Sequence, residues 1–335
     1  MAATRFAFDD QIQSQAGAVA AALRVSGVPS LDPERPLLFS GIGTSLHACQ
    51  VAAYWVAELS DGALRPAAVE AHELALHGGI HAHDQVVVVS HRGTKRFPNQ
   101  LLARASSVGA TTVMVTGLGA PSPTADFVLR TCPDERASTH TVSYLTALAV
   151  LGRLVATTLD AGDFADRLGL VPEAIAETLA LPGPIRIPPR LINREPIVVT
   201  GYGIDAITAD EAALKIKEGA YLFAEGMSQE LALHGTPAVF ESRMAAIMLQ
   251  PGRDDGGREP ELRSLLRELG VLVLSSGPGE TDLPFARTDY LLRPLVAIIP
   301  IQRLVAELGR GRGSNPDLTR GDVEPWASAI PKVHL

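Results

Sequence analysis

Two segments of the chain repeat one pattern, in which an apolar run leads into Gly-x-Gly and then into a helix-like segment. The first copy begins at Pro36–Gly43 and the second at Pro196–Gly203, and their glycines stay in register, Gly41 with Gly201. A strand that turns tightly into a helix needs glycine at such positions. Because similarity at a fixed offset indicates a duplicated structural unit, we predict two copies of one α/β domain.

Short β-branched runs alternate with longer helical patterns along both copies, which is typical of a parallel sheet covered on both faces. In the first copy we expect strands at 37–40, 67–69, 85–90, 111–116 and 127–130, with helices near 9–23, 45–59, 98–108 and 139–159. In the second copy we expect strands at 244–249, 271–274 and 290–292, with helices near 205–221, 259–269 and 300–308. The predicted fold class is α/β, with two tandem doubly wound, flavodoxin-like parallel sheets.

Composition sets limits on the partners and the location of the protein. With 335 residues and 46% hydrophobic content, the chain can bury a large core in about two domains. A net charge of −8 argues against duplex nucleic acid or an anionic membrane surface as a partner. The N-terminus shows no targeting pattern, and the longest apolar runs are too short to span a membrane, so we expect a cytoplasmic protein. Cys49 and Cys132 lack C-x-x-C spacing and are expected to be structural thiols.

A proline-rich stretch, 181–196, separates the two copies. Proline removes a backbone donor and opposes a continued helix, so this stretch is the predicted linker. We expect an N-terminal helix in residues 1–24, the first domain in 25–180, the linker in 181–195, the second domain in 196–310 and a C-terminal tail in 311–335.

An amine and two carboxylates occur close together after the second Gly-x-Gly. On a helix, Glu211, Lys215 and Glu218 share one face, because residues three or four apart are neighbours, while Lys217 turns away. A lysine beside a carboxylate can form an imine with a ketose, and the carboxylate can move a proton between adjacent carbons. His234 adds an imidazole that could open a sugar ring. Taken alone, the Glu211–Lys215 spacing is also typical of a surface ion pair worth about 0.3–0.5 kcal/mol.

Two loops place hydroxyl groups where parallel strands are expected to end. Thr44 and Ser45 follow Gly43 at a predicted helix N-terminus, where free N–H groups and the helix dipole attract an anion such as phosphate. The loop 90–96 follows another buried strand and reaches the same edge, where ligands of doubly wound folds bind. We therefore predict a phosphate pocket here, with ordinary capped turns as the alternative.

Several motifs together resemble the double sugar-isomerase (SIS) domain family, in particular the isomerase half of glutamine–fructose-6-phosphate aminotransferases. The resemblance spans nearly the whole chain. The matching segments are Phe8–Gln15, Gly41–Ser45, Val69–Glu73, Ala137–Thr139 with His140 in place of a lysine, Glu211–Glu218, and Glu230-x-x-x-His234-Gly-x-Pro237. The last two, taken together, are the most specific.

The resemblance implies two SIS domains and a sugar-phosphate isomerase or amino-sugar phosphate isomerase-deaminase. Lys215 would contact the carbonyl end of the open ketose, Glu218 would move a proton between C1 and C2, and His234 would aid ring opening from the partner subunit of a homodimer. Lys332 resembles the tail lysine that closes over the sugar, with a frayed terminus as the alternative. The candidate substrate-binding residues are Gly43, Thr44, Ser45, Ser90, His91, Arg92, Thr94, Lys95, Ser138 and Glu211.

The second loop departs from the family pattern S-x-S-G-x-T, since Arg92 replaces the inner serine and Lys95 occupies the final hydroxyl position. A guanidinium binds phosphate or carboxylate bidentately, so the pocket either accepts a more anionic group or is filled by Arg92. The chain shows neither a catalytic N-terminal cysteine nor the roughly 200 residues of a glutaminase domain, so we expect glutamine not to be the amine donor.

Two other functions remain open at this point. A ketosamine-phosphate deglycase would use the same scaffold, and a non-catalytic sugar-phosphate sensor would bind without chemistry. The sensor is less favoured, because no helix-turn-helix segment precedes the first domain and the acid–base residues are intact. We expect no cofactor and no metal, since the histidine-rich stretch of His72, His77, His81 and His83 lacks carboxylates or cysteines in ligand spacing. No nucleic-acid or membrane partner is expected.

Overall fold

The computed structural model describes residues 4–121 and 124–333. The chain forms two compact units, one built around each copy of the repeated pattern. The described residues of the repeat-1 unit fall within Gln15–Glu135, Val142–Pro172 and Ser328–Leu335, and those of the repeat-2 unit within Met1–Ser14, Arg136–Thr141 and Glu173–Ala327. α1 (Ala7–Ala22) therefore gives its first residues to the repeat-2 unit.

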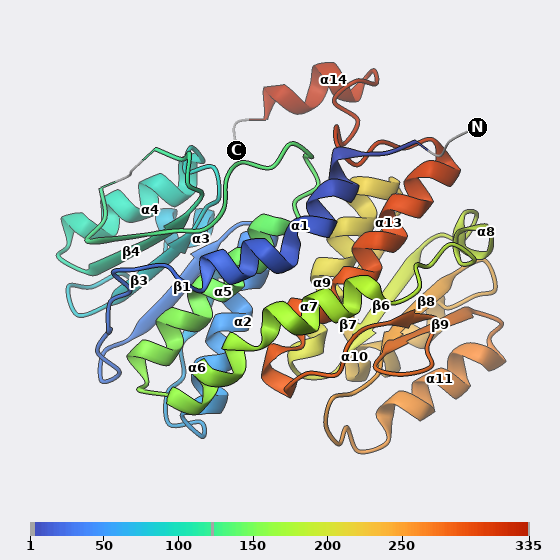
Figure 1. The fold of residues 1–335 in the computed structure, drawn as a ribbon, viewed down its shortest axis with the longest axis horizontal. Helices are drawn as coiled ribbons and strands as arrows, with labels where there is room; N and C mark the ends of the chain where they lie inside the picture. The colour runs from blue at the N-terminus through green and yellow to red at the C-terminus, as the bar shows by residue number, and fades with distance from the viewer. Residues whose placement is uncertain (1–3, 122–123, 334–335) are drawn as a thin grey trace. The chain divides into compact units, whose positions relative to one another are not determined.

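The repeat-1 unit contains a parallel five-stranded sheet of order β2-β1-β3-β4-β5; β1, β3 and β4 are labelled in Figure 1. Its strands are β1 (Leu37–Gly41), β2 (Ala67–Glu70), β3 (Gln85–Val89), β4 (Thr111–Thr116) and β5 (Phe127–Arg130). Its helices are α2 (Thr44–Leu59), α3 (Ala71–Leu76), α4 (Arg96–Ser107), α5 (Val142–Thr158) and α6 (Gly162–Gly169). Every residue of β3 is buried, because Val86 and Val88 pack with α3 and α4 while alternate residues face the opposite layer.

The repeat-2 unit contains a second parallel sheet, whose order read from one edge is β7-β6-β8-β9-β10. Its strands are β6 (Ile197–Gly201), β7 (Ala224–Ser228), β8 (Ala245–Leu249), β9 (Leu272–Gly277) and β10 (Leu283–Pro284). Its helices are α7 (Val171–Ala180), α8 (Pro188–Leu191), α9 (Ile204–Lys215), α10 (Gln229–Leu233), α11 (Arg258–Glu268), α12 (Pro294–Ala297) and α13 (Ile299–Arg312). Single turns include η1 (Ile216–Ala220), η2 (Thr236–Val239) and η3 (Tyr290–Leu292); α14 (Trp326–Ala329) and η4 (Ile330–Lys332) follow near the C-terminus.

The two sheets share one topology, since the first strand of each, β1 or β6, lies between the second and third strands of the same sheet in chain order. The turns after the first strands also agree in backbone geometry: Gly43 has φ 55 and ψ −127, and Gly203 has φ 58 and ψ −123. A positive φ of this kind favours glycine, which explains why the glycines stay in register. The predicted pair of doubly wound parallel α/β domains is confirmed.

Several predicted elements have different bounds or types in the structure. The helix expected from residue 139 begins at Val142, because the carboxylate of Glu135 accepts the Val142 and Ser143 N–H groups at 3.1 and 2.7 Å. The strand predicted at 290–292 is wrong: this segment is the 3₁₀ turn η3, in which the Asp289 carboxylate accepts the Leu291 N–H at 3.0 Å. Strands β7 and β10 and helices α3, α6 to α8, α10, α12 and α14 were not predicted.

Candidate active site

α9 and the turn after it carry a cluster of one amine and two carboxylates. Lys215 Nζ lies 2.6 Å from Glu218 Oε2 and 3.4 Å from Glu211 Oε1. The side chains of Lys215 and Glu211 are fully buried, whereas the Glu218 side chain keeps 30% of its surface exposed. Burial excludes the surface ion pair that the spacing alone allowed. Glu218 therefore connects the buried amine to solvent, and Lys217 is exposed, as predicted.

The helix changes from α to π directly after Lys215, at Ile216–Ala220. Single π turns occur frequently at functional sites, because they shift the side chains of one turn relative to the next. Glu218 stands inside this turn, and Tyr221 ends it in the left-handed conformation with φ 55. The sequence predicted one regular helix here, since Ile216–Ala220 contains no proline that would mark an interruption.

Gly219 allows the π turn to pack against α13. A Cβ added at this glycine would lie 2.3 Å from Val305 Cγ1, so we expect Gly219→Ala to destabilise the protein by about 1–3 kcal/mol through overpacking. Gly17→Ala is a matched control, because a Cβ on this helical glycine of α1 would meet no atom within 4 Å. Urea unfolding measures both variants. Equal stability of the two would show that the close approach to Val305 is not significant.

Residues 312–320 hold the end of the π turn in place. The Tyr221 hydroxyl donates to the carbonyl oxygen of Asn315 at 2.9 Å and accepts from the Arg320 N–H at 2.7 Å. The Arg320 guanidinium lies 4.7 Å from the centroid of the Tyr221 ring and 3.8 Å from that of Trp326. Such stacking of a guanidinium on aromatic rings contributes about 0.5–1 kcal/mol per contact at exposed sites. The segment after α13 thus fixes the backbone next to Glu218.

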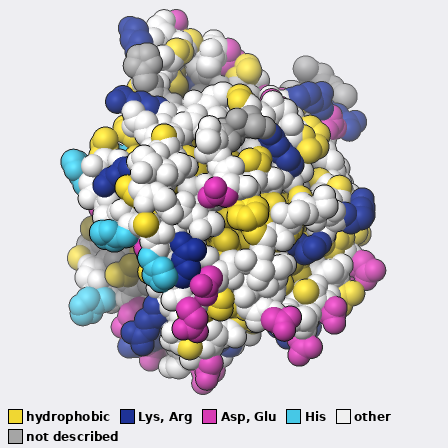
Figure 2. Space-filling model, turned by 90° about the vertical axis from the view of Figure 1, so that its left-hand side faces the viewer, with side chains coloured by type: hydrophobic (Ala, Val, Ile, Leu, Met, Phe, Trp, Pro, Cys, Tyr) yellow, Lys and Arg dark blue, Asp and Glu magenta, His cyan; other side chains and the backbone are white. Residues whose placement is uncertain are grey.

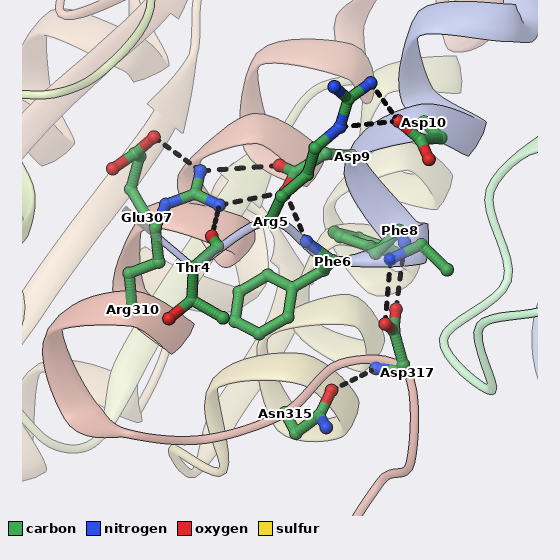
Figure 3. A network of polar contacts seen from close by, with 11 residues as sticks. Thr4, Arg5, Phe6, Phe8, Asp9, Asp10, Glu307, Arg310, Asn315 and Asp317 are labelled. Carbon is green, nitrogen blue, oxygen red and sulfur yellow. Dashed lines mark hydrogen bonds and ion pairs between the residues drawn. The ribbon is translucent and has the colours of Figure 1, made fainter. Parts of the chain in front are cut away.

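Asp317 joins three segments of the repeat-2 unit; Figure 3 shows its contact with the start of α1. Its carboxylate accepts the N–H groups of Ala7 and Phe8, each at 2.8 Å, at the start of α1. A carboxylate is favourable at a helix N-terminus, where N–H groups lack partners in the helix. The Asp317 carbonyl oxygen accepts the Ser138 N–H at 2.9 Å. Ser138, a predicted substrate-binding residue, is therefore tied to the segment that holds the π turn.

His234 follows α10 and is exposed. Its backbone N–H donates to Glu230 O at 3.0 Å, and within the described part of the chain no hydrogen bond or ion pair of its imidazole occurs. The apolar side chains of Leu231 and Val239, on either side in the sequence, are 61% and 63% exposed. The histidine thus stands in an exposed surface segment that is rich in apolar groups.

In the repeat-1 unit, the loops after β1 and β3 lie at the same edge of the sheet, because β1 pairs with β3 in parallel. Thr44 and Ser45 begin α2 and are half-buried, and Ser90 at the end of β3 is buried. Thr94 is exposed. Three of the predicted phosphate-binding hydroxyl groups therefore stand at one edge of this sheet, at the junction between β1 and β3 where its topology changes direction.

The charged residues of the loop after β3 have unequal exposure. Arg92 is exposed, so its side chain does not fill an interior cavity, and Lys95 is half-buried. Burial lowers the pKa of Lys95, and the nearby Arg92 lowers it further. Burial also lowers the pKa of His91, against the opposing effects of Glu135 and Asp134. The imidazole is therefore neutral at physiological pH, and the positive charge of this loop comes from the two longer side chains.

The corresponding loop of the repeat-2 unit is closed by its own side chains. Ile204 and Asp205 replace the two hydroxyl residues that begin α2 in the first copy. The Tyr290 hydroxyl accepts the Ile204 N–H at 3.1 Å, and buried Asp205 pairs with buried Arg293 at 2.9 and 3.0 Å. Sequence reasoning missed this pair, although the loss of both hydroxyl groups in an otherwise matching repeat was a signal that the two loops differ.

The remaining predicted features stand apart from these two groups. Lys332 ends η4 and is exposed. Histidine side chains gather at one side of the surface in Figure 2, but nowhere within residues 4–121 and 124–333 do three His, Cys, Asp or Glu side chains form a set that could hold a metal ion. Cys49 and Cys132 are free and buried, and burial raises the pKa of Cys132 to about 11. None of the described helices combines the length and apolar character that crossing a membrane requires.

The comparison with family models agrees with the geometry of the repeat-1 unit. Residues 30–156 match the SIS domain. This segment is a SIS domain. The matched segment runs from before β1 into α5 and includes both loops with the predicted phosphate-binding groups.

Relatives of this SIS-domain chain extend the likeness into the second copy. A glutamine–fructose-6-phosphate aminotransferase from Pyrococcus horikoshii is 27% identical over 307 residues, which are 85% of this chain and 50% of that protein. The enzyme of the same name from Mycobacterium tuberculosis is 29% identical over 167 residues, 46% of this chain and 27% of that protein. The chain thus spans half or less of the length of these relatives.

Solved structures show the same fold over almost the whole chain. The C-terminal domain of glucosamine-fructose-6-phosphate aminotransferase from Francisella tularensis has a TM-score of 0.81 at 19% identity, covering 94% of this chain and 98% of that one. Glucosamine-6-phosphate deaminase from Thermotoga maritima has a TM-score of 0.73 at 20% identity, covering 93% and 97%. At this identity the likeness establishes the fold.

Proposed function

We propose that this protein is a sugar-phosphate isomerase or amino-sugar phosphate isomerase-deaminase that moves a proton between C1 and C2 of its substrate. The main support is the buried Lys215 ammonium, 2.6 Å from the partly exposed carboxylate of Glu218. Carbonyl chemistry on a sugar needs an amine that can form an imine and an acid–base group that can move a proton. Lys215 and Glu218 provide these two groups in direct contact. The related proteins named above include an isomerising aminotransferase and a deaminase.

In this proposal Lys215 first passes a proton to Glu218 across their 2.6 Å contact, which leaves a neutral amine. The amine adds to the carbonyl carbon of the open-chain sugar, and Glu218 returns its proton to the departing hydroxyl group, so that water leaves and a protonated imine forms. Glu218, again a carboxylate after giving up its proton, takes a proton from one carbon and returns it to the adjacent carbon. Hydrolysis of the imine frees Lys215. Glu211, buried 3.4 Å from the amine, balances the ammonium charge between turnovers.

We assign phosphate binding to Thr44, Ser45 and Ser90, together with the backbone N–H groups at the start of α2. These side chains stand at the edge of the sheet where ligands of doubly wound folds bind. The N-terminus of a helix of 16 residues favours an anion at this position. The proposal covers three reactions that share the proton transfer between C1 and C2. These are amination of the sugar with free ammonia, release of an amine from the sugar, and isomerisation without an amine.

The decisive experiment is to incubate the protein with hexose and hexosamine 6-phosphates in deuterated water and to follow exchange of the C2 hydrogen by NMR. Exchange catalysed by the wild-type protein supports the isomerase and deaminase chemistry. Binding of these compounds without hydrogen exchange would reject this proposal and favour the non-catalytic sensor or the ketosamine-phosphate deglycase.

We further propose a homodimer in which His234 of each subunit acts in the site of its partner. The support is the exposure of this histidine in a segment whose apolar side chains, Leu231 and Val239, are more than half exposed. Burying such groups against a second copy is favourable at about 25 cal/mol per Å² of apolar surface. In that position the imidazole is free to help open the sugar ring.

Mixing two inactive variants tests this arrangement. Lys215→Met and His234→Ala should each be inactive alone, but a co-refolded 1:1 mixture should regain about a quarter of wild-type activity. In each mixed dimer, one site then holds both an intact lysine and an intact histidine. If the histidine acts within its own subunit, the mixture stays inactive and this part of the proposal fails.

A further inference from the structure

The loop after β3 carries more positive charge than a phosphate group needs. Arg92 and Lys95 stand on the short connection between β3 and α4, beside the β1–α2 turn. Neither side chain forms an ion pair or a side-chain hydrogen bond with any of the residues that the structure describes. Arg92 is exposed and Lys95 half-buried, so an incoming ligand can reach both.

Two helix N-termini add to this charge. The residues that precede α2 and α4 make no side-chain capping hydrogen bond, and these helices are 16 and 12 residues long. α5 of the same unit differs, because its first N–H groups are bonded to the carboxylate of Glu135. The unit thus caps α5 with the side chain of an acid, whereas the residues directly before α2 and α4 provide no side-chain cap.

Acidic groups near the loop do not balance the charge. Glu135 is engaged by two backbone N–H groups at the start of α5. Asp134 approaches His91 Nε2 at 3.7 Å, but its side chain is 70% exposed, so water and salt screen it. Placing half-buried Lys95 near a second cation is unfavourable, as the lowered pKa of Lys95 indicates. Like charges that stand close together at the edge of the sheet where ligands bind indicate that Arg92 and Lys95 bind an anion.

The sum of charges identifies the chemistry of the ligand. Arg92 and Lys95 each carry one positive charge, and the N-termini of α2 and α4 each act as roughly +0.5, so the total is about +3. A phosphate monoester supplies only about −1.5 to −2 at neutral pH. About one positive charge is therefore not balanced by the phosphate, and one further acidic group next to the phosphate would balance it. A guanidinium binds either a carboxylate or a phosphate bidentately, so the second group is one of these two.

We propose that Arg92 and Lys95 form an anion subsite for a second acidic group, carboxylate or phosphate, that lies beside the phosphate of the substrate. The subsite rests on the proposed function, in which Thr44, Ser45 and Ser90 hold the phosphate itself. It makes the preferred substrate a sugar phosphate with two adjacent acidic groups, and a simple hexose monophosphate, which lacks the second group, a more weakly bound substrate.

Calorimetric titration at fixed ionic strength tests the subsite with four small probes: ethyl phosphate, inorganic phosphate, 2-phosphoglycolate and inorganic pyrophosphate. The wild-type protein should bind at least one of the last two about tenfold or more tightly than ethyl phosphate. Preference for 2-phosphoglycolate identifies a carboxylate as the second group, and preference for pyrophosphate identifies a phosphate. Equal affinity for all four probes, or no binding, overturns the proposal.

The variant Arg92→Ala/Lys95→Ala should lose this preference while its affinity for ethyl phosphate changes less than about threefold. Arg96→Ala removes a neighbouring cation whose guanidinium lies over the Phe97 ring at 5.0 Å, and it should keep the preference. An equal loss of ethyl phosphate binding in the double variant would mean that the two cations hold the phosphate itself, and the subsite would be rejected. Circular dichroism confirms that the variants are folded.

Lys215→Met separates this inference from the proposed function. The variant should lose C2 hydrogen exchange but keep the probe preference, because the probes contain no carbonyl sugar. If the wild-type protein exchanges the C2 hydrogen of simple hexose 6-phosphates but shows no preference among the probes, the subsite is rejected and the isomerase proposal stands. A probe preference without any exchange would reject the isomerase proposal and leave the subsite standing.

Discussion

Glu218→Gln is expected to slow exchange of the C2 hydrogen of a hexose 6-phosphate with solvent deuterium by about 10²–10⁴-fold. Glutamine keeps the shape of the side chain and its place beside Lys215, but it cannot accept the proton. The Glu218 carboxylate lies 2.6 Å from the amine and is partly exposed, so the proposed mechanism assigns it the contact with both the lysine and the substrate. NMR in deuterated water measures the exchange rate directly.

Lys215→Met should abolish exchange as well, and it should also abolish trapping of the substrate. Sodium borohydride reduces an imine to a stable amine, so peptide mass spectrometry of the wild-type protein should show the sugar attached at Lys215. Lys217→Met is the matched control, because this lysine stands two residues away but is exposed, and it should leave exchange and trapping unchanged. Unaltered exchange in both Lys215→Met and Glu218→Gln would remove the proposed mechanism.

Arg293→Met is expected to destabilise the protein by about 3–5 kcal/mol, since it leaves the carboxylate of Asp205 buried and unpaired. The double variant Asp205→Asn/Arg293→Met should recover most of this loss, because removing both charges together is close to neutral. Urea unfolding of the two single variants and the double variant measures the coupling. Additive effects would contradict a direct interaction between the two side chains.

The same pair predicts a pH dependence of stability. Burial raises the pKa of Asp205 from 3.8 to about 6, and Arg293 partly opposes this rise. Between these two values the folded protein binds the proton more tightly than the unfolded chain does. The contribution of Asp205 to stability therefore falls as the pH rises from about 4 to about 6 and is constant above that. Asp205→Asn should lack this slope; an unchanged slope in the variant would assign it to another group.

The duplicated α/β fold was predictable because its causes are local. Strands Thr111–Thr116 and Phe127–Arg130 have the predicted bounds, since short β-branched runs between turn residues leave few alternatives. The Gly-x-Gly turns at Gly43 and Gly203 also follow from sequence, because only glycine accepts their backbone angles readily. The predicted strand at 290–292 failed because a side-chain bond from Asp289 stabilises a turn there.

Within the candidate site, the helical spacing of Glu211, Lys215 and Glu218 predicted their common face correctly. It did not predict that Lys215 and Glu211 are fully buried or that a π turn brings Glu218 to 2.6 Å from the amine. Those features depend on α13, which packs on Gly219, and on Tyr221, which bonds to residues 94 and 99 positions later in the chain.

The sequence by itself determined the class of fold, the repetition and the candidate catalytic residues, because periodicity, glycine turns and residue types act over one or two turns of chain. The tertiary structure alone decided that the turn before α9 is closed by Tyr290, Asp205 and Arg293, whereas the corresponding turn of the first copy leads into half-buried Thr44 and Ser45. It likewise decided that an ordinary-looking Glu–Lys spacing is a buried cluster. Burial and ion pairing between distant segments determine the charge states of these groups. A local sequence pattern does not predict which distant segments will come into contact.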